Sequence, residues 1–450
     1  QDGSVKCIED EIPFELPEGW AWCRLNSIVD VRDGTHDTPT YVDKGIPLIT
    51  SKNLVEGGID YSNVKYISEK DAISINDRSG VNIGDILFAM IGTIGNPSMV
   101  TEDILISIKN VALFKFTFSK NLSNHFVMYF LDYAQEDMKN KPSGGLQPFV
   151  SLNFLRTYLV PVPPVEEQQR IVSILADSIN KIRNIDVLKN ELTASVKKAK
   201  SKILDLAIRG KLVPQDPNDE PASVLLERIR VEKEELIKQG KIKRDKKESI
   251  IFRGDDNSYY EKIGDDIENI DTEIPFNLPD NWIWCRGCSC FSGMETTKPQ
   301  GEFFDYIDID SIDNRLHCIK KTKRIPVIEA PSRASRAINS GSVLFSLVRP
   351  YLENIALIEE IHSHSIASTG FYVCNSNGLL LPDYMFYLMI SKYVVDGLNQ
   401  YMKGDNSPSI SRNDIENWLY PIPPIDEQRR ICYILKTTFA TIEKLEESLI

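Results

Sequence analysis

The sequence predicts an α+β protein in which two homologous domains are separated by long antiparallel coiled-coil helices related by a pseudo-twofold axis. Three observations predict this fold class: a tandem internal repeat, short β-type runs within each copy, and an apolar heptad pattern after each copy. The chain has 450 residues, which is too long for a single hydrophobic core.

Two motifs anchor the internal repeat. EIPFELPEGWAWCR at Glu11–Arg24 matches EIPFNLPDNWIWCR at Glu273–Arg286, at an offset of 262 residues. PVPPVEEQQRIVSIL at Pro161–Leu175 matches PIPPIDEQRRICYIL at Pro421–Leu435, at an offset of 260 residues. Because the matches are collinear and the period is far longer than a solenoid repeat, we infer a domain duplication and name its halves copy 1 and copy 2.

The two copies diverge between these anchors. GTHDTP at Gly34–Pro39 has only a loose counterpart in GMETTKP at Gly293–Pro299. One scaffold that presents two different surfaces would explain shared ends with a variable middle. Neutral drift after an old duplication is the alternative explanation.

Each variable middle alternates short β-type runs with Gly, Asn and Asp. One helix is expected near Asn124–Met138 and its partner near Asp383–Leu398. The expected strands include Ile46–Thr50, Val64–Ile67, Asp85–Ile91, Val111–Phe118, Tyr306–Asp310, Ser342–Val348 and Gly370–Cys374. Each copy is therefore predicted to form an α+β domain large enough to bury its own core.

A helical pattern follows each Pro-Pro pair, with acidic residues in its first turn. Apolar residues recur there at alternating steps of four and three, which is typical of a coiled-coil seam. The predicted seam comprises Ile171, Leu175, Ile182, Ile185, Leu192, Val196, Ile203, Leu206, Ile431, Leu435, Ile442 and Leu445. We expect the two helices to pack on each other; alternatively, each packs on its own domain.

These patterns divide the chain into four segments. Residues 1–160 and 271–420 are the two domains, residues 161–270 are a central helical spacer and linker, and residues 421–450 are a distal helix that packs on the central one. The spacer ends in a turn-rich linker at Arg209–Pro221, followed by a charged helix at Ala222–Gln239. The missing initial Met indicates a processed or truncated chain. The short second helix indicates either a chain cut at Ile450 or a copy 2 that needs a shorter helix.

Composition narrows the functional classes. The net charge of −13 argues against a uniformly basic nucleic-acid binder, although a local basic patch would suffice for binding. No apolar run of eighteen residues and no signal pattern are present, so no membrane association is expected. The eight scattered cysteines indicate reduced thiols and a cytoplasmic location.

No catalytic constellation is recognisable in the sequence. It lacks the phosphate-binding GxxxxGK[ST] pattern and any GxGxxG after a strand, so we assign no catalytic residue. Cys285, Cys288 and Cys290 cluster without the paired spacing of a zinc site. We expect thiols and no metal here, with a structural metal completed by His317 or Cys318 as the alternative.

Basic residues gather in the variable middles and could contact phosphates or base edges. A solvated charged face is the simpler alternative. In copy 1 they are Arg32, His36, Lys44 and Lys52, and in copy 2 they are Lys320, Lys321, Lys323, Arg324, Arg333, Arg336 and Arg349.

Together the motifs resemble one known family. The paired WxW sequences at Trp20 and Trp282, the two P-x-P-P-x-x-E-Q motifs and RGKLVPQ at Arg209–Gln215 carry the resemblance, as does GDDNSYYEKIG at Gly254–Gly264. Over nearly its whole length the chain resembles the specificity subunit of a type I restriction–modification system.

This resemblance implies two target recognition domains, each reading half of a split double-stranded DNA sequence. The helices would separate the halves and dock two methyltransferase subunits, and a restriction subunit would complete the nuclease. S-adenosylmethionine and ATP would bind those partners, with no cofactor on this chain. GTHDTP and SGGLQP at Ser143–Pro148 resemble loops of such domains, which adds Thr35 and Gln147 to the expected DNA contacts.

Two other functional classes stay open on sequence alone. The chain could be a scaffold that binds two protein partners without DNA, or a single-chain enzyme with an unfamiliar site. Salt-dependent binding of random duplex DNA would separate the first from a DNA-binding subunit. Activity of the pure chain without a methyltransferase subunit would support the second.

Overall fold

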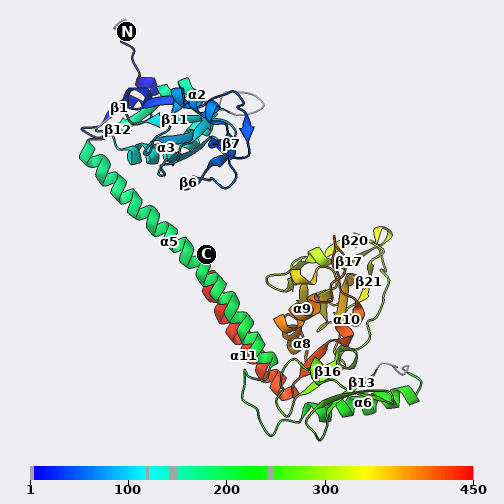
Figure 1. Ribbon diagram of the computed structural model, residues 1–450. Coiled ribbons are helices and arrows are strands. Elements are labelled where there is room, and N and C mark those ends of the chain that lie inside the picture. The colour runs from blue at the N-terminus through cyan, green and yellow to red at the C-terminus, as the bar shows by residue number, and fades with distance from the viewer. Residues whose placement is uncertain (1–4, 118–120, 141–148, 242–247, 449–450) are drawn as a thin grey trace. The chain divides into compact units, whose positions relative to one another are not determined.

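The computed structural model of the protein describes residues 5–117, 121–140, 149–241 and 248–448 (Figure 1). The chain divides into two compact units, Gln1–Asp186 and Val187–Ile450, and the division falls within one long helix. Helices and strands are mixed in both units, which confirms the predicted α+β class. The four predicted segments follow the sequence repeat and stay a prediction.

The copy 1 domain is built on two four-stranded sheets. The first has the order β10 (Ser107–Lys109), β4 (Ile46–Thr50), β7 (Lys65–Ile67) and β3 (Tyr41–Val42). The second has the order β2 (Asp30–Asp33), β11 (Val111–Lys115), β8 (Ile86–Ala89) and β9 (Gly95–Met99). Only β10 and β4 run parallel among the neighbours in these two sheets.

The central strands of copy 1 are apolar on both faces because both faces are covered. Ile86 and Phe88 of β8 belong to one core cluster, which includes residues of helix α3 (Asn124–Asn140). Leu87 and Ala89 of the same strand belong to a second cluster with Ile49 of β4. The run ILFA thus alternates between two cores, as the period of two residues requires.

The copy 2 domain repeats this framework. Its first sheet has the order β20 (Lys323–Pro326), β17 (Phe303–Ile307), β24 (Ile366–Ser368) and β21 (Ala334–Ala337). Its second sheet has the order β23 (Ile355–Leu357), β22 (Val343–Ser346) and β25 (Phe371–Cys374). Helices α8 (Pro382–Met389), α9 (Lys392–Asn399) and α10 (Arg412–Asn417) follow these strands.

The first sheets of the two copies share three strands and differ at one edge. In copy 2, β17 is parallel to β24 and antiparallel to β20, as β4 is to β10 and β7 in copy 1. Copy 1 adds β3 beside β7, whereas copy 2 adds β21 beside β24. The duplicated scaffold therefore carries a different edge strand in each copy.

The repeated sequence motifs meet in space. β1 (Ala21–Arg24) pairs with β12 (Leu159–Val162), and β16 (Ile283–Arg286) pairs with β26 (Leu419–Ile422). The same register places Trp22 opposite Pro161 and Trp284 opposite Pro421. The short helices α1 (Leu25–Ile28), α4 (Leu152–Thr157) and α7 (Gly287–Cys290) flank these pairs.

Helix α5 (Val165–Ile208) has 44 residues, and helix α11 (Ile425–Glu447) packs against its end (Figure 1). Leu204 and Ile208 share a core cluster with Ile431 and Leu435. Lys200 Nζ lies 2.6 Å from Glu446 Oε2. Residue numbers fall along α5 as they rise along α11, so the two helices are antiparallel as predicted.

The predicted seam extends further than this contact does. Ile182, Ile185 and Leu192 are 59%, 62% and 43% exposed, because the end of α11 lies beside Lys200. Their place in the seam stays a prediction, whereas Ile171 packs on the copy 1 core, the alternative left open. The other seam positions differ in burial. Ile431 and Leu435 are buried, and Leu175 and Leu445 are exposed. The half-buried positions are Val196, Ile203, Leu206 and Ile442.

Between the copies lie helix α6 (Ala222–Lys238), close to the predicted charged helix, and a three-stranded sheet. The strands are β13 (Ser249–Arg253), β14 (Tyr259–Ile263) and β15 (Asp266–Asn269). Glu261 of β14 accepts hydrogen bonds from Arg286, which ties this sheet to copy 2. Across the described residues, every helix is too short or too polar to cross a membrane.

Candidate nucleic-acid interface

In copy 1 the loop Gly34–Pro39 lies against the end of β10. The Thr35 backbone N–H donates to the Ile108 carbonyl at 3.0 Å, and the Asn110 N–H donates to the Thr35 carbonyl at 3.1 Å. A Cβ on Gly34 would lie 2.3 Å from the Ile108 carbonyl oxygen, so only glycine permits this approach. The backbone of the loop is therefore held to the sheet at Thr35.

His36 fixes the centre of this loop. Its Nδ1 lies 2.9 Å from Asn110 Oδ1 and its Nε2 lies 3.0 Å from Asp33 Oδ2, so both ring nitrogens face acceptors. Hydrogen bonds that His36 donates to Asn110 and Asp33 raise the pKa of His36, since only the protonated ring donates to both. Asp33 is buried and also binds Arg78 of helix α2 (Glu69–Ser79).

Further polar residues lie beside the loop. Lys109 Nζ donates to Thr38 Oγ1 at 2.7 Å, and Ser51 Oγ donates to the Asn110 carbonyl at 3.3 Å. Ser51 begins the short helix η2 (Ser51–Asn53), which presents the exposed Lys52. Thr35, His36, Lys52, Lys109 and Asn110 thus gather where β10 and β4 end, and we call this group the copy 1 polar face.

Other residues predicted for copy 1 lie elsewhere. Lys44 precedes β4, at the strand end opposite to η2. Arg32 binds Asp30 at 2.7 Å and the Arg78 carbonyl at 3.1 Å, so its guanidinium has structural partners. Gln147 lies outside the described residues.

Sequence reasoning missed Lys109, Asn110 and Arg78. Asn110 has a φ of 57°, the left-handed conformation that Asn tolerates best after Gly, and it separates two buried strands. A Lys-Asn pair between two apolar runs was a usable turn signal. Arg78 gave none, because its partner is 45 residues away.

Three of the predicted basic residues of copy 2 fall on two edges of one sheet. Lys323 and Arg324 belong to β20, whereas Arg336 belongs to β21, three interstrand spacings away or about 14 Å. Because side chains alternate along a strand, Lys323 and Arg324 also point to opposite faces. The predicted cluster is therefore divided.

The environments of these cations differ. Lys323 binds Asp308, which raises its pKa, and the Arg324 guanidinium lies 5.4 Å from the centre of the Phe303 ring. Lys320, Lys321 and Arg333 are exposed, and Arg336 Nε is buried without a hydrogen-bond partner among the described residues. These side chains are available for an anionic ligand to different degrees.

Arg349 organises a loop of copy 2. Its backbone adopts a φ of 48°, its N–H donates to the Pro408 carbonyl at 2.8 Å, and its Nη2 donates to the Asn406 carbonyl at 3.0 Å. The side chain therefore ties β22 to the loop that leads to α10. Its charge is exposed, but its geometry is set by these contacts.

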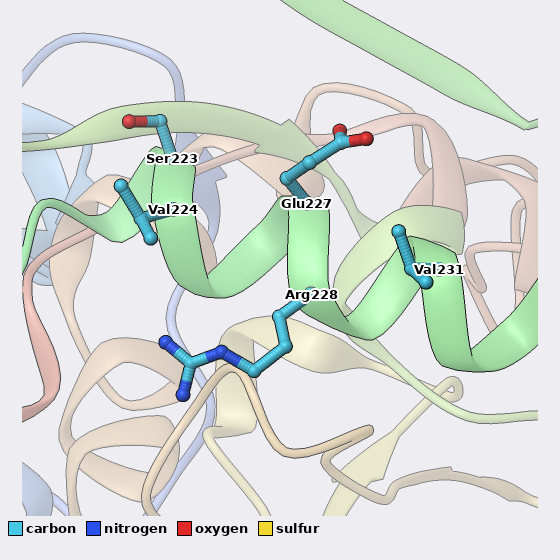
Figure 2. A pocket seen from close by; sticks show the side chains of 5 residues that line it. All are labelled: Ser223, Val224, Glu227, Arg228 and Val231. Atoms are coloured by element: carbon cyan, nitrogen blue, oxygen red, sulfur yellow. The ribbon is translucent and has the colours of Figure 1, made fainter.

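The cysteine cluster named from the sequence lies in β16 and the short helix α7. Cys285 and Cys290 are buried, and burial raises the pKa of Cys285 to about 12. Over the described ranges, no three His, Cys, Asp or Glu side chains form a group suited to a metal ion. A surface hollow on α6 is lined by Ser223, Val224, Glu227, Arg228 and Val231, all from one helix face (Figure 2).

Known proteins resemble this chain over both copies. A family profile described as "Type I restriction modification DNA specificity domain" matches residues 17–194. The type I restriction enzyme EcoAI specificity subunit of Escherichia coli is 27% identical, covering 97% of this chain and 80% of the relative. The EcoEI specificity subunit of Escherichia coli is 24% identical, covering 99% of this chain and 82% of the relative.

A solved structure concerned with complex assembly and conformational transition of the type I R-M system shares the fold. It covers 97% of this chain and 94% of its own, with a TM-score of 0.61 and 17% sequence identity. The family profile, the full-length relatives and the shared fold agree with the paired motifs. Over nearly its whole length the chain is similar to the specificity subunits of type I restriction–modification systems.

Proposed function

We propose that this specificity subunit recognises a DNA target in two parts, with one half-site read by each copy. The observation that carries the proposal is the shared three-strand framework with a different edge and different polar residues in each copy. Two similar domains with different surfaces suit two different half-sites. As a specificity subunit, the chain is the recognition component of its system and not its catalyst.

The copy 1 polar face has the chemistry that one half-site requires. Lys52 and Lys109 can neutralise phosphates, while Thr35 and Asn110 can exchange hydrogen bonds with base edges. His36 positions the loop that carries Thr35, because it joins the loop to Asp33 and Asn110. In copy 2, Arg324, Arg333 and Arg336 are the corresponding candidates, on two edges of the sheet.

The exposed apolar residues of α5 support docking of methyltransferase subunits. Ile174, Ile182, Ile185 and Leu188 are each at least 59% exposed, although their spacing places them on one side of the helix. Such a stripe is costly in water and suits a partner helix. We propose two methyltransferase subunits and one restriction subunit as partners, with the S-adenosylmethionine and ATP sites on those partners.

Mapping methylated sites in cells with and without the gene tests this function. The proposal predicts that one split sequence motif loses methylation when the gene is deleted. It also predicts no methyl transfer from labelled S-adenosylmethionine by the purified chain alone. A continuous motif, or methylation by the chain alone, would contradict the proposal; binding of two proteins without DNA would favour the scaffold alternative.

A further inference from the structure

The first sheet of each copy leads into the same kind of short, capped helix. In copy 1, β4 leads into η2, where Thr50 and Asn53 bind each other's backbone N–H groups in a capping box. In copy 2, β17 leads into η4 (Ile309–Ser311), where Asp308 and Ser311 form the same box. The two helices therefore occupy equivalent positions in the duplicated scaffold.

A short hairpin follows each of these helices and fixes the register between the copies. The Asp60 N–H donates to the Asn53 carbonyl at 2.8 Å after the hairpin of copy 1. The Lys320 N–H donates to the Ser311 carbonyl at 2.9 Å after the hairpin of copy 2. Asn53 and Ser311 are therefore equivalent. The hairpins are β5 (Leu54–Val55) with β6 (Gly58–Ile59), and β18 (Ile312–Asp313) with β19 (Cys318–Ile319).

The residue before each of these two positions differs in charge between the copies. It is Lys52 in copy 1 and Asp310 in copy 2, and both side chains are exposed. Within the part of the chain that the structure describes, neither side chain forms a hydrogen bond or a salt bridge. The neighbouring Lys323 ammonium group binds Asp308. The Asp310 carboxylate is therefore available to a ligand.

Asp310 lies beside other polar groups at this end of the sheet. A Cβ on Gly370 would lie 3.2 Å from Ile309 Cδ1, so the residues after β24 lie against η4. The Thr369 N–H donates to the Arg333 carbonyl at 2.8 Å, which brings the exposed Arg333 to the same end. We call this group the copy 2 polar face; its members are Asp310, Lys320, Arg333 and Thr369.

We infer that Asp310 reads a base in the half-site of copy 2, by accepting a hydrogen bond from the amino group of a cytosine. This inference rests on the proposed function, since it assigns a residue to one of the two half-sites. A carboxylate only accepts hydrogen bonds, so it cannot bind guanine O6 and N7 or thymine O4, which are acceptors too. Adenine has an amino group, but its N7 acceptor repels the second carboxylate oxygen. Cytosine has the amino group without such a neighbour.

The negative charge of Asp310 separates base reading from binding of the DNA backbone. Phosphates repel a carboxylate, so Asp310 weakens binding to DNA in general and strengthens it only where an amino group meets it. Lys320 and Arg333 are exposed and can bind phosphates of the same half-site. Loss of Asp310 should therefore reduce discrimination between bases while it increases affinity for random DNA. Loss of a residue that only supports the fold would reduce both.

Competition binding by the assembled methyltransferase tests this inference with Asp310→Ala. The DNA is the mapped target with each base pair varied in turn, and a random duplex is measured beside it. The unchanged chain should prefer cytosine at one position of one half-site, and Asp310→Ala should reduce that preference about tenfold. The same variant should bind the random duplex more tightly, because one negative charge is removed.

A cytosine analogue that lacks the amino group, 2-pyrimidinone, isolates the contact itself. Placed at the preferred position, the analogue should weaken binding of the unchanged chain about tenfold more than it weakens binding of Asp310→Ala. Any effect of the analogue on the duplex is common to both chains, so it cancels in this comparison. Equal weakening in the two chains would show that Asp310 does not bind this amino group.

Glu329→Ala is the matched control. Glu329 is exposed and belongs to η5 (Val327–Glu329), at the opposite end of the sheet, where Pro326 pairs with Phe303 at the start of β17. This variant removes the same charge and should leave the cytosine preference within about twofold. An unchanged base preference in Asp310→Ala, or the same change in Glu329→Ala, would overturn the inference while the split target stands. A continuous target would contradict the proposed function instead.

Discussion

The indole nitrogen of Trp282 donates a hydrogen bond to the Glu427 carboxylate at 2.9 Å, across 145 residues of sequence. Trp20 and Glu167 form the same bond at 3.1 Å, across 147 residues. Each bond joins the start of a domain to the start of the helix that follows it. The two motifs of each copy are therefore one structural unit, and the intervening domain can change without disturbing it.

Glu427→Ala should destabilise copy 2 by about 2 kcal/mol or more, because it leaves the buried Trp282 N–H without an acceptor and removes the hydrogen bond from Gln215. Glu167→Ala should cost about 1 kcal/mol, since Glu167 is half-buried. Denaturant unfolding followed by tryptophan fluorescence measures both. Equal losses in the two variants would show that the linker adds nothing to the stability of copy 2.

Gly210→Ala should destabilise the chain by about 2 kcal/mol or more, because it combines a positive φ with a clash against Pro279. Gly240→Ala is its control, with a φ of 69° and no atom within 4 Å of an added Cβ. That control should cost about 1 kcal/mol. Thermal unfolding compares the two, and equal midpoints would mean that the linker does not lie against Pro279.

Ile431→Asp and Ile182→Asp should differ sharply in their effect on the isolated chain. Ile431 is fully buried beside the end of α5, so an aspartate there should cost about 3 kcal/mol or more. Ile182 is 59% exposed, so its variant should unfold at nearly the unchanged temperature. The Ile182 variant should instead bind its methyltransferase partner less tightly. Normal docking would exclude this part of α5 from the interface.

Lys52→Ala and Lys109→Ala should each reduce the salt dependence of DNA binding. Losing one phosphate contact lowers the slope of log Kd against log salt by about 0.9. Lys44→Ala should leave the slope unchanged, because Lys44 lies at the other end of β4. Titrations of the assembled methyltransferase at several salt concentrations measure the three slopes. If only Lys44→Ala reduces the slope, the DNA contacts the Lys44 end of β4 and not the copy 1 polar face.

His36 should make recognition by copy 1 dependent on pH. Its pKa in the folded chain is raised by Asn110 and Asp33, so its stabilising contacts are complete below about pH 6.5 and lost as the pH rises through the raised value. Since the side chain is 58% exposed, the loss in DNA affinity should be at most about fivefold. His36→Gln should make DNA affinity less dependent on pH in this range. If the pH dependence of DNA affinity is unchanged in this variant, His36 does not hold the loop in place.

The sequence allowed the duplication, the helix starts and the α+β class to be predicted, because these depend on local motifs and periodicity. Helix α5 could be predicted from its heptad pattern. The extent of its contact with α11 could not, because Lys200 and Glu446 are far apart in the sequence and come together only in the folded chain. β20 was not expected, so the opposite directions of Lys323 and Arg324 went unnoticed. His36 was identified as basic, while its partner Asn110 lies 74 residues away and gave no local sign of the contact.

Exchange of one domain tests the central claim of two independent half-sites most directly. Residues 25–158 would be replaced by the corresponding segment of another specificity subunit, so that Trp20, Glu167 and both strands of the β1–β12 pair stay in place. Methylated sites would then be mapped for the exchanged chain with its methyltransferase. The account predicts that one half of the target changes while the other half is retained, whereas a change in both halves, or in neither, would contradict it.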